Sequence, residues 1–501
     1  MKLNRLLILA YLSSVPLYAS EADRNQSLNP GFISESYQPL RDKLLKSAIA
    51  VNGMNSFQFE DISEGIKLKT KYEIDAGKVH NQKSSGRCWI FAGEKLLSAE
   101  LRKTLGKDFS FSQNYFAFWD KMERVNYILE KLFEMDQADP ADIQVQELLK
   151  LSGDGGEWEF FKNIVSKYGV VPDYVMPETN FSGNTAGFNK ILKTLIRHGY
   201  GQILQIKSRS LNDHDAGTEF DQVKKEIMKS AYNILSSYLG TPPQAHKKHP
   251  GKFYWKHTGP SLSEQKDSNT EQKRDSPQDE YVTLISPLEL LKRSGVNVDD
   301  YIHVAHLPYL TSGLSGLQQG SQVIAKNVGN IIGGEELKAI LLDMPEIKES
   351  VRNSIKSGVG VEIGCDMKHL DAKRSLLSLS SDTYKDIFQI SSGYVEKGIR
   401  LRTGEDKIAH GMLIVGCDDP TKCLVKDALP EDDIPESFGP LWKVHNSWGD
   451  QASAIFLTDP WFDEYAQSFV IRKDFLPESL FKSPLKTFEI PSSDPFAQVT
   501  S

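Results

Sequence analysis

The chain has 501 residues, of which 39% are hydrophobic and 25% are charged, and it carries a formal net charge of −8. This composition excludes a disordered or fibrous protein, and the length predicts two or three packed units around a common site. The negative charge argues against a dedicated nucleic-acid binder, which needs a basic surface.

The first nineteen residues have the pattern of a secretory signal peptide. Basic residues precede an apolar run from Leu6 to Leu17, and Ala19 is a small residue suited to cleavage, with Ala22 as the second candidate. The run is too short to cross a bilayer comfortably, and no later segment has eighteen apolar residues in a row. We therefore predict a protein exported to the periplasm, a lumen or the medium, with no membrane span after the signal is removed.

An N-terminal segment covers residues 20–63. Further along the chain, Cys88 stands in the run QKSSGRCWIFA, six residues after Gln82. Leucines at positions 97, 101 and 105 follow at helical spacing, so a helix is expected to begin at the thiol. A helix N-terminus stabilises a thiolate and lowers its pKa. The Gln82 amide and the Cys88 backbone N–H are a suitable pair of donors for an oxyanion. A buried structural cysteine and a surface glutamine are the alternative interpretations.

Two further helical segments follow, FSFSQNYFAFWDKMERVNYILEKLFEM and DGGEWEFFKNIVSKYGVVP, and they complete a mainly helical half over residues 64–185. Residues 186–355 contain an amphipathic stretch at 220–239 and a strongly polar loop at 256–280. His246, His249 and His257 lie in this region at irregular spacing within a basic stretch. We expect solvated side chains there and no metal site.

From Gly358 onward the sequence consists of short apolar runs separated by turn residues, which predicts an antiparallel sheet or barrel over residues 356–480. His410 opens one of these runs and Asn446 follows another. A rigidly held imidazole can deprotonate a thiol, and an amide oxygen can accept its second N–H and fix the tautomer. Trp448 is expected to shield that bond from water. Taken singly, a structural histidine and a turn asparagine are the alternatives.

Four cysteines are too few for a disulfide scaffold, so the fold must be stabilised by packing. Cys417 and Cys423 flank a turn-like stretch. They either pair locally or remain two thiols, and spacing alone does not decide between these possibilities.

Together these residues resemble the papain-like cysteine peptidases, and more closely their bleomycin hydrolase and aminopeptidase C branch. The similar stretches include QKSSGRCWIFA, GVEIGCDM, AHGMLIVG, WKVHNSWG and the tail IPSSDPF, and they cover most of the chain. The resemblance implies an α+β papain-like fold with a helical layer, an antiparallel β-barrel-like layer, a large helical insertion and a C-terminal arm. Trp89, which follows the thiol in the GRCW signature, is expected to be a supporting residue of the site.

The distance from Cys88 to His410, 322 residues, far exceeds the spacing of about 130 to 150 residues common in papain-like enzymes. A domain of residues 186–355 is therefore expected to be inserted. The resemblance implies that this insertion serves a ring-shaped homohexamer with an internal channel. It also implies that Gly155 and Gly156 bind substrate backbone, although a simple turn explains them as well.

By the same resemblance, the arm at residues 481–501 lies in the cleft, and the carboxylate of Ser501 meets the free ammonium of the substrate. We therefore predict an exported cysteine aminopeptidase that hydrolyses N-terminal residues from peptides through a thioester and needs no cofactor. The alternatives are a cysteine endopeptidase with an open cleft and a catalytically silent binding or assembly protein.

Overall fold

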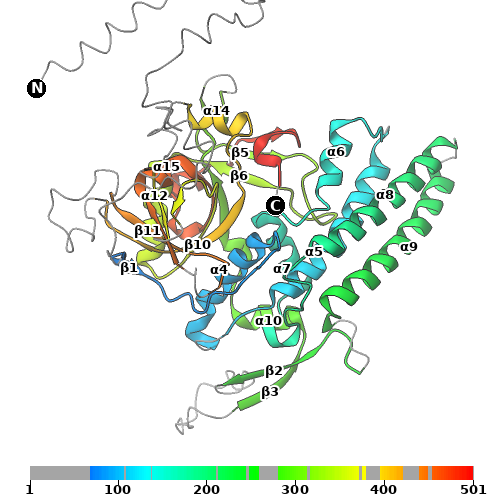
Figure 1. Ribbon diagram of the computed structural model, residues 1–501, viewed down its shortest axis with the longest axis horizontal. Helices are drawn as coiled ribbons and strands as arrows, with labels where there is room; N and C mark the ends of the chain where they lie inside the picture. Colours follow the sequence, from blue (N-terminus) through cyan, green and yellow to red (C-terminus); the bar gives the residue numbers. More distant parts are fainter. Residues whose placement is uncertain are drawn as a thin grey trace, which may run out of the picture. The chain divides into compact units, whose positions relative to one another are not determined.

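The computed structural model describes residues 68–105, 109–136, 138–209, 213–243, 248–258, 280–312, 316–371, 375–379, 395–420, 439–449 and 454–499 (Figure 1). They belong to one compact unit, Gly65–Ser501. The second unit, Met1–Glu64, lies outside the described residues, and so do the predicted signal peptide and N-terminal segment.

The core of the described unit is a 12-stranded mixed sheet with the strand order β14-β5-β6-β4-β13-β7-β10-β11-β12-β9-β8, in which β1 adds to the side of β10. The strands are β1 (Tyr72–Glu73), β4 (Tyr301–Ala305), β5 (Gln322–Ala325), β6 (Lys338–Leu341), β7 (Val361–Cys365), β8 (Leu370–Asp371), β9 (Leu376–Leu377), β10 (His410–Cys417), β11 (Leu441–His445), β12 (Ala454–Thr458), β13 (Ala466–Arg472) and β14 (Thr487–Ile490). The pairs around β7, β10, β11 and β13 are antiparallel. Parallel pairing occurs between β4 and β6, β5 and β14, and β9 and β12.

The side chains of the central strands point alternately into two apolar cores, because successive residues of a strand face opposite sides of the sheet. On β10, Leu413 and Val415 belong to the core that contains Trp89, whereas Met412 and Ile414 belong to the core on the other face. The sheet is thus covered on both sides, which explains why the apolar runs noted in the sequence are nearly continuous.

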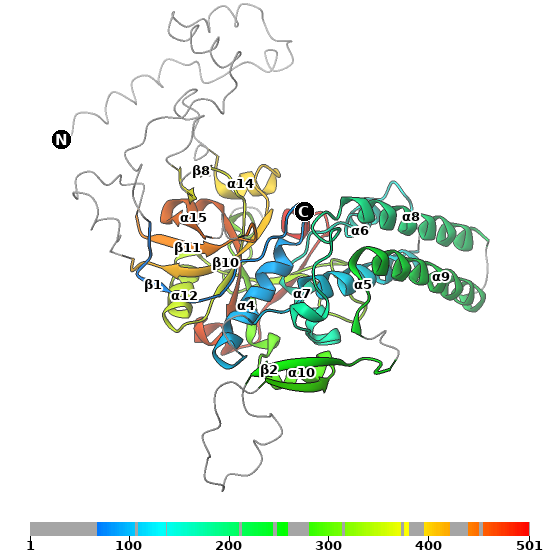
Figure 2. The same ribbon diagram turned by 60° about the horizontal axis from the view of Figure 1, so that its bottom comes forward.

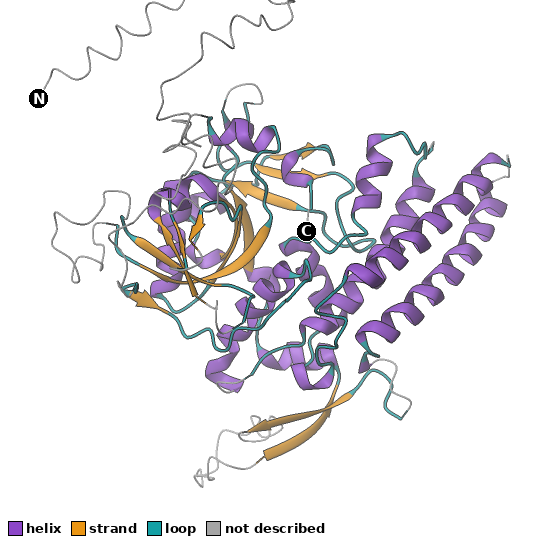
Figure 3. Cartoon of the chain, in the orientation of Figure 1, coloured by secondary structure: helices purple, strands orange, loops and turns teal. Residues whose placement is uncertain are grey.

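The helices are α4 (Cys88–Leu105), α5 (Gln113–Glu134), α6 (Ile143–Lys150), α7 (Trp158–Tyr168), α8 (Ala186–Ser208), α9 (Asp213–Leu239), α10 (Pro287–Ser294), α11 (Pro308–Thr311), α12 (Met344–Lys356), α14 (Lys397–Arg402) and α15 (Asp459–Tyr465). Helix α4 packs against β10, and α5, α8 and α9 pack on one another. Figures 2 and 3 show these three long helices grouped away from the strands of the large sheet.

Several expectations from the sequence are confirmed. The helix at the thiol begins at Cys88, the two following helical segments form α5 and α7, and the apolar runs after Gly358 form β7, β10, β11 and β12. Apart from these expectations, no helix among the described residues is long and apolar enough to span a membrane. The mixed α+β architecture is as predicted, although the sheet contains parallel pairs as well as the expected antiparallel ones.

The predicted boundaries at residues 185 and 355 remain predictions. The segment between them supplies α8 and α9, but it also supplies β4, β5 and β6 to the large sheet. The stretch 256–280, expected to be a polar loop, begins and ends inside a hairpin of β2 (Phe253–Thr258) and β3 (Glu280–Ile285). Residues 259–279 lie outside the described residues.

Candidate active site

Three residues that precede Cys88 fix the turn before α4 through hydrogen bonds. The guanidinium of Arg87 is 2% exposed and makes paired hydrogen bonds of 3.0 and 2.7 Å to the Glu178 carboxylate. The Gly86 N–H donates to Asp154 Oδ2 at 3.2 Å. Ser85 Oγ donates to the Gln82 carbonyl at 2.6 Å. The turn is thereby fixed at the helix start, where free backbone N–H groups favour negative charge.

The Cys88 side chain is more buried than its sequence context suggested. It is 9% exposed, and burial raises the pKa of the thiol, although the backbone N–H groups of Gly411 and Trp89 act in the opposite direction. The N–H groups at the start of α4 act in the expected direction and lower the pKa, but burial is the larger cause in this state of the protein. Desolvation outweighs the favourable backbone dipoles because the thiolate loses its hydration.

His410 begins β10, and its Nε2 lies 2.7 Å from Asn446 Oδ1. An amide oxygen only accepts, so Nε2 carries the proton and Nδ1 is left as the basic nitrogen. The Ser447 backbone N–H donates to the same oxygen at 2.7 Å, which fixes the orientation of the amide. Burial lowers the pKa of His410, and the bond to Asn446 opposes that shift. The imidazole is therefore held in its neutral form.

At the glycine after His410, the strand runs beside the start of the helix at ordinary packing distance. A Cβ atom at Gly411 would lie 3.4 Å from the Trp89 nitrogen and 3.6 Å from the Cys88 carbonyl carbon. The start of β10 thus lies directly against the start of α4. Cys88 and His410 line the same cavity, which has a volume of about 780 Å³.

Gln82 is held beside them by Ser447. Its backbone N–H donates to the Ser447 carbonyl at 2.8 Å, and the Ser447 hydroxyl donates to Gln82 Oε1. The Gln82 Nε2 group donates to the Ser85 carbonyl at 2.5 Å, which occupies one of its two N–H bonds. The second N–H remains available for a ligand in the cavity that Gln82 and Cys88 share. Ser447 is a residue of the candidate site that the sequence did not single out, although it directly follows Asn446.

The two tryptophans occupy different positions around this centre. The ring of Trp448 lies 5.4 Å from that of His410 and is partly exposed, so it covers the outer side of the imidazole. Trp89 is buried, and its indole donates to the Asp154 carbonyl at 2.8 Å. A Cβ atom at Gly156 would lie 2.3 Å from that indole, so only glycine fits there. Gly155 is buried, and a role of these glycines in substrate binding stays a prediction.

Asp154 is a second residue that the sequence did not single out. It is 6% exposed, and its carboxylate lies 2.7 Å from Lys121 Nζ and accepts from the side chains of Thr185 and Asn189. Burial raises its pKa, but the charge of Lys121 and these hydrogen bonds outweigh burial and hold the pKa well below its ordinary value. The ionised group joins the turn before Cys88 to α5 and α8.

The large cavity has a basic wall. Beyond the catalytic candidates its lining includes four cations, one from the turn and three from α8: Lys83, Lys190, Lys193 and Arg197. The Asp154 carboxylate in the same lining is already neutralised by Lys121. A negatively charged part of a ligand would be favoured along this wall.

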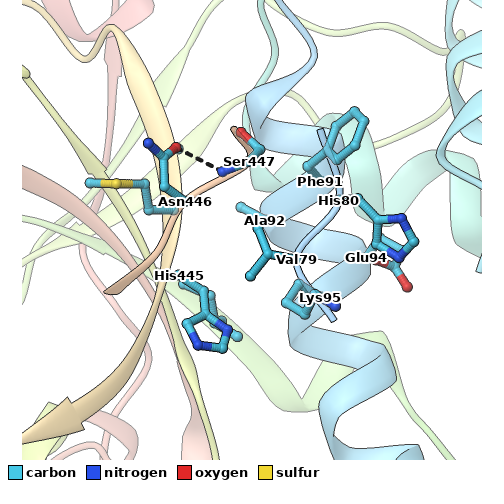
Figure 4. A pocket seen from close by; sticks show the side chains of 12 residues that line it. Val79, His80, Phe91, Ala92, Glu94, Lys95, His445, Asn446 and Ser447 are labelled. Atoms are coloured by element: carbon cyan, nitrogen blue, oxygen red, sulfur yellow. Dashed lines mark hydrogen bonds between the residues drawn. The ribbon is translucent and has the colours of Figure 1, made fainter. Parts of the chain in front are cut away.

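A small cavity of about 20 Å³ is lined by residues 79–80, by α4, by the first half of β10 and by residues 445–447. Burial lowers the pKa of His445 in this cavity to about 4 and also lowers that of His80. Both rings are therefore neutral near pH 7. Figure 4 shows the labelled side chains of this cavity, Val79, His80, Phe91, Ala92, Glu94, Lys95, His445, Asn446 and Ser447.

The described part of the C-terminal arm is anchored to the unit. Tyr309 donates to Asp494 Oδ1 at 2.6 Å, and Phe496 and Ala497 are each 3% exposed. The Phe496 ring lies 5.7 Å from that of His303. Ser501, predicted to meet the substrate, lies outside the described residues.

The remaining sequence predictions concern metals and the cysteine pair. No group of three or more His, Cys, Asp or Glu side chains suited to a metal ion occurs in the part of the chain that the structure describes. Cys417 is buried within β10, while Cys423 lies outside the described residues.

Comparison with known proteins places the chain among cysteine peptidases. A family model described as "Peptidase C1-like family" matches residues 25–496. An aminopeptidase C of Lactobacillus delbrueckii subsp. lactis is 29% identical over 82% of this chain and 83% of its own length. The human bleomycin hydrolase is 28% identical over 88% of each chain. The crystal structure of PepW from Lactobacillus rhamnosis superposes with a TM-score of 0.76 at 26% identity, covering 96% of this chain and 98% of the other.

Proposed function

The chain belongs to the Peptidase C1-like family, and on this premise we propose that it is an exported cysteine aminopeptidase with Cys88 as its nucleophile. The relatives named aminopeptidase C and bleomycin hydrolase match most of its length, which supports the predicted enzyme class, a cysteine-type aminopeptidase. The observation that carries the proposal is the 2.7 Å bond between His410 and Asn446 at a cavity that also contains Cys88 and Gln82.

In the proposed reaction, His410 Nδ1 takes the proton of the Cys88 thiol as the sulfur attacks the carbonyl carbon of the first peptide bond. The oxyanion is stabilised by the free N–H of Gln82 and by the Cys88 backbone N–H. His410 then gives its proton to the leaving amine, and a thioester remains on Cys88. Water, activated by His410, hydrolyses the thioester and restores the thiol. Asn446 keeps the imidazole in the required tautomer throughout.

We further propose that the fold is the papain-like one and that the C-terminal arm restricts cleavage to the N-terminal end of peptides. The packing of α4 against the antiparallel pair β7 and β10, and the buried anchor at Phe496, support this arrangement. A ring-shaped homohexamer remains a proposal that rests on resemblance. Export rests on the N-terminal sequence pattern.

The central experiment is an assay of the purified protein on aminoacyl reporters whose amine is either free or acetylated. We expect turnover of the free amines alone, and complete loss of turnover in Cys88→Ala with an unchanged thermal unfolding temperature. Turnover that survives in Cys88→Ala would assign the chemistry to another residue. Equal cleavage of the acetylated reporters would favour the endopeptidase alternative. Absence of turnover on every reporter would favour the silent binding protein.

A further inference from the structure

Three cations of α8 form a row along the large cavity. Lys190, Lys193 and Arg197 line this cavity together with Cys88 and His410. Residues three or four apart lie on one face of a helix, so the three side chains share a face. The row rises about 10 Å along the helix axis from the first cation to the last. The Arg197 guanidinium donates to the Lys193 carbonyl at 3.2 Å, which directs its charge back along the row.

The row begins where α8 is tied to the turn before Cys88. Asn189 directly precedes Lys190, and its side chain donates to Asp154 Oδ1 at 2.6 Å. The other oxygen of Asp154 accepts from the Gly86 N–H at 3.2 Å. One carboxylate thus holds the first turn of α8 against the turn that precedes the nucleophile. The row of cations therefore leads away from the nucleophile along α8.

A fourth cation of the same cavity comes from the turn before α4. Lys83 directly follows Gln82, and its backbone has a φ of 52°, in the left-handed region that favours glycine. A Cβ atom at Gly183 would lie 2.7 Å from Lys83 Cδ, so the lysine stem lies over the segment that leads into α8. Because glycine would suit this backbone better, local conformation does not account for a lysine at this position.

The charges of these four residues are not used inside the fold. Asp154 is the one acid among the described residues that lines the cavity, and Lys121 already holds it at 2.7 Å. At the far end of α8, by contrast, Arg209 is paired with Glu219 of α9 at 2.7 Å. The four cations of the basic wall have no salt bridge to an acid in the part of the chain that the structure describes. Their charges therefore remain available to a ligand.

The length of the row indicates which part of a peptide it meets. An extended peptide advances about 3.3 Å per residue, so a row of about 10 Å matches about three residues. In an aminopeptidase that removes one residue at a time, a single residue lies on the amino side of the cleaved bond. That residue is too short to occupy the row, whereas the residues after the cleaved bond are long enough to follow it.

We propose that the basic wall, Lys83, Lys190, Lys193 and Arg197, binds carboxylate groups of the substrate within about three residues after the cleaved bond. This inference rests on the proposed aminopeptidase function and names its substrate class, peptides with an acidic portion behind the first residue. Ammonium and guanidinium groups donate charge-assisted hydrogen bonds to carboxylates. The carboxylates come from Asp and Glu side chains or from the C-terminus of a short peptide.

The test uses the full-length protein and two pentapeptide amides with a free amine, which carry either Glu or Gln at the third and fourth residues. The measured quantity is the ratio of kcat/KM, Glu peptide over Gln peptide, for release of the first residue. We expect a ratio of about ten at low salt, mainly through KM, because each exposed ion pair contributes a few-fold. Raising the salt from about 10 mM to about 1 M shortens the screening length about tenfold and should abolish the preference.

The wall variant and its control remove the same charge from neighbouring helices. Lys190→Gln combined with Lys193→Gln should lower the ratio about threefold, and Lys190→Glu combined with Lys193→Glu should reverse the preference. Lys225→Gln combined with Lys229→Gln is the matched control, since these two cations of α9 are exposed and do not line the cavity. The control should keep the ratio of the unmodified protein. An equal fall in the control would assign the preference to net charge and overturn the proposal.

Two further comparisons identify the source and the place of the carboxylate. The Gln peptide with a free C-terminal acid, compared with its amide, tests the chain terminus, and a preference for the acid that the wall variant loses would support that source. A preference for Glu over Gln at the first residue alone would place the cations on the amino side of the cleaved bond and overturn the proposal.

The outcomes separate this inference from the aminopeptidase function. If all the peptides lose their first residue at equal rates, the basic wall is overturned and the aminopeptidase function stands. If no peptide and no free-amine reporter is cleaved, both proposals fail. The wall variant should unfold at the temperature of the unmodified protein, because its side chains have no acidic partner among the described residues. A lower unfolding temperature, with an equal loss of activity on every peptide, would assign the cations to stability and overturn the proposal.

Discussion

Gln82 and Ser447, which are 365 residues apart in the chain, are hydrogen-bonded to each other twice. The Gln82 backbone N–H donates to the Ser447 carbonyl at 2.8 Å, and the Ser447 hydroxyl donates to Gln82 Oε1. Ser447 also donates its own N–H to Asn446 Oδ1. A single serine therefore contacts and orients both amides of the candidate site, those of Gln82 and Asn446.

The first prediction concerns this serine. Ser447→Ala should lower kcat about tenfold with little change in KM, because the Gln82 amide then rotates away from the oxyanion in part of the molecules. Steady-state kinetics on a free-amine reporter measures both constants. Ser447→Thr keeps the hydroxyl and should restore most of kcat, and an unchanged kcat in Ser447→Ala would show that packing alone orients Gln82.

A second prediction concerns the pH dependence of Cys88. Its raised pKa favours the protonated thiol at neutral pH, and the lowered pKa of His410 favours a neutral imidazole. The thiolate fraction should therefore rise with pH, and the rate of alkylation by iodoacetamide should increase about tenfold per pH unit from about pH 6 to about pH 8.

The alkylation rate is measured by mass spectrometry of the peptide that contains Cys88, and Cys88→Ala supplies the blank. Cys365 and Cys417 are fully buried and should label far more slowly. A rate that is constant from about pH 5 to about pH 8 would instead indicate a preformed thiolate–imidazolium pair and contradict the neutral resting state.

The third prediction compares two glycines. Gly156→Ala should destabilise the protein by about 1–3 kcal/mol, because the added methyl group would lie 2.3 Å from the Trp89 indole and force it to move. Gly201→Ala, within α8, has no atom within 4 Å of the added group and should stabilise the protein by about 0.5–1 kcal/mol. Denaturant unfolding measures both, and equal effects at the two sites would contradict the close packing on Trp89.

The fourth prediction concerns the arm. Removing residues 498–501 should leave the buried anchor at Phe496 and Ala497 intact and admit cleavage of acetylated peptides, since the end of the arm no longer blocks the cleft. Removing residues 491–501 is the comparison and should also lower the unfolding temperature because it takes away that anchor. Acetylated peptides that stay uncut in the shorter deletion would show that the arm is not the gate.

Local sequence patterns predicted much of the secondary structure. The helix at Cys88 follows from leucines at helical spacing, and β7, β10, β11 and β12 follow from apolar runs bounded by turn residues. The pattern was less informative within residues 186–355, where short strands such as β4 and β6 alternate with helices. These strands form because they pair with strands far away in the sequence, and their own four or five residues do not identify them as strands.

For the site, the sequence by itself determined which groups are present: a thiol at a helix start, an amide six residues before it, an imidazole at a strand start and an amide after the next strand. Only the tertiary structure decided that burial raises the pKa of Cys88 and that Ser447 joins Gln82 to Asn446. The reason is physical. Residue type sets the chemistry of a group, whereas desolvation and pairing depend on neighbours hundreds of residues away, which the chain brings together only on folding.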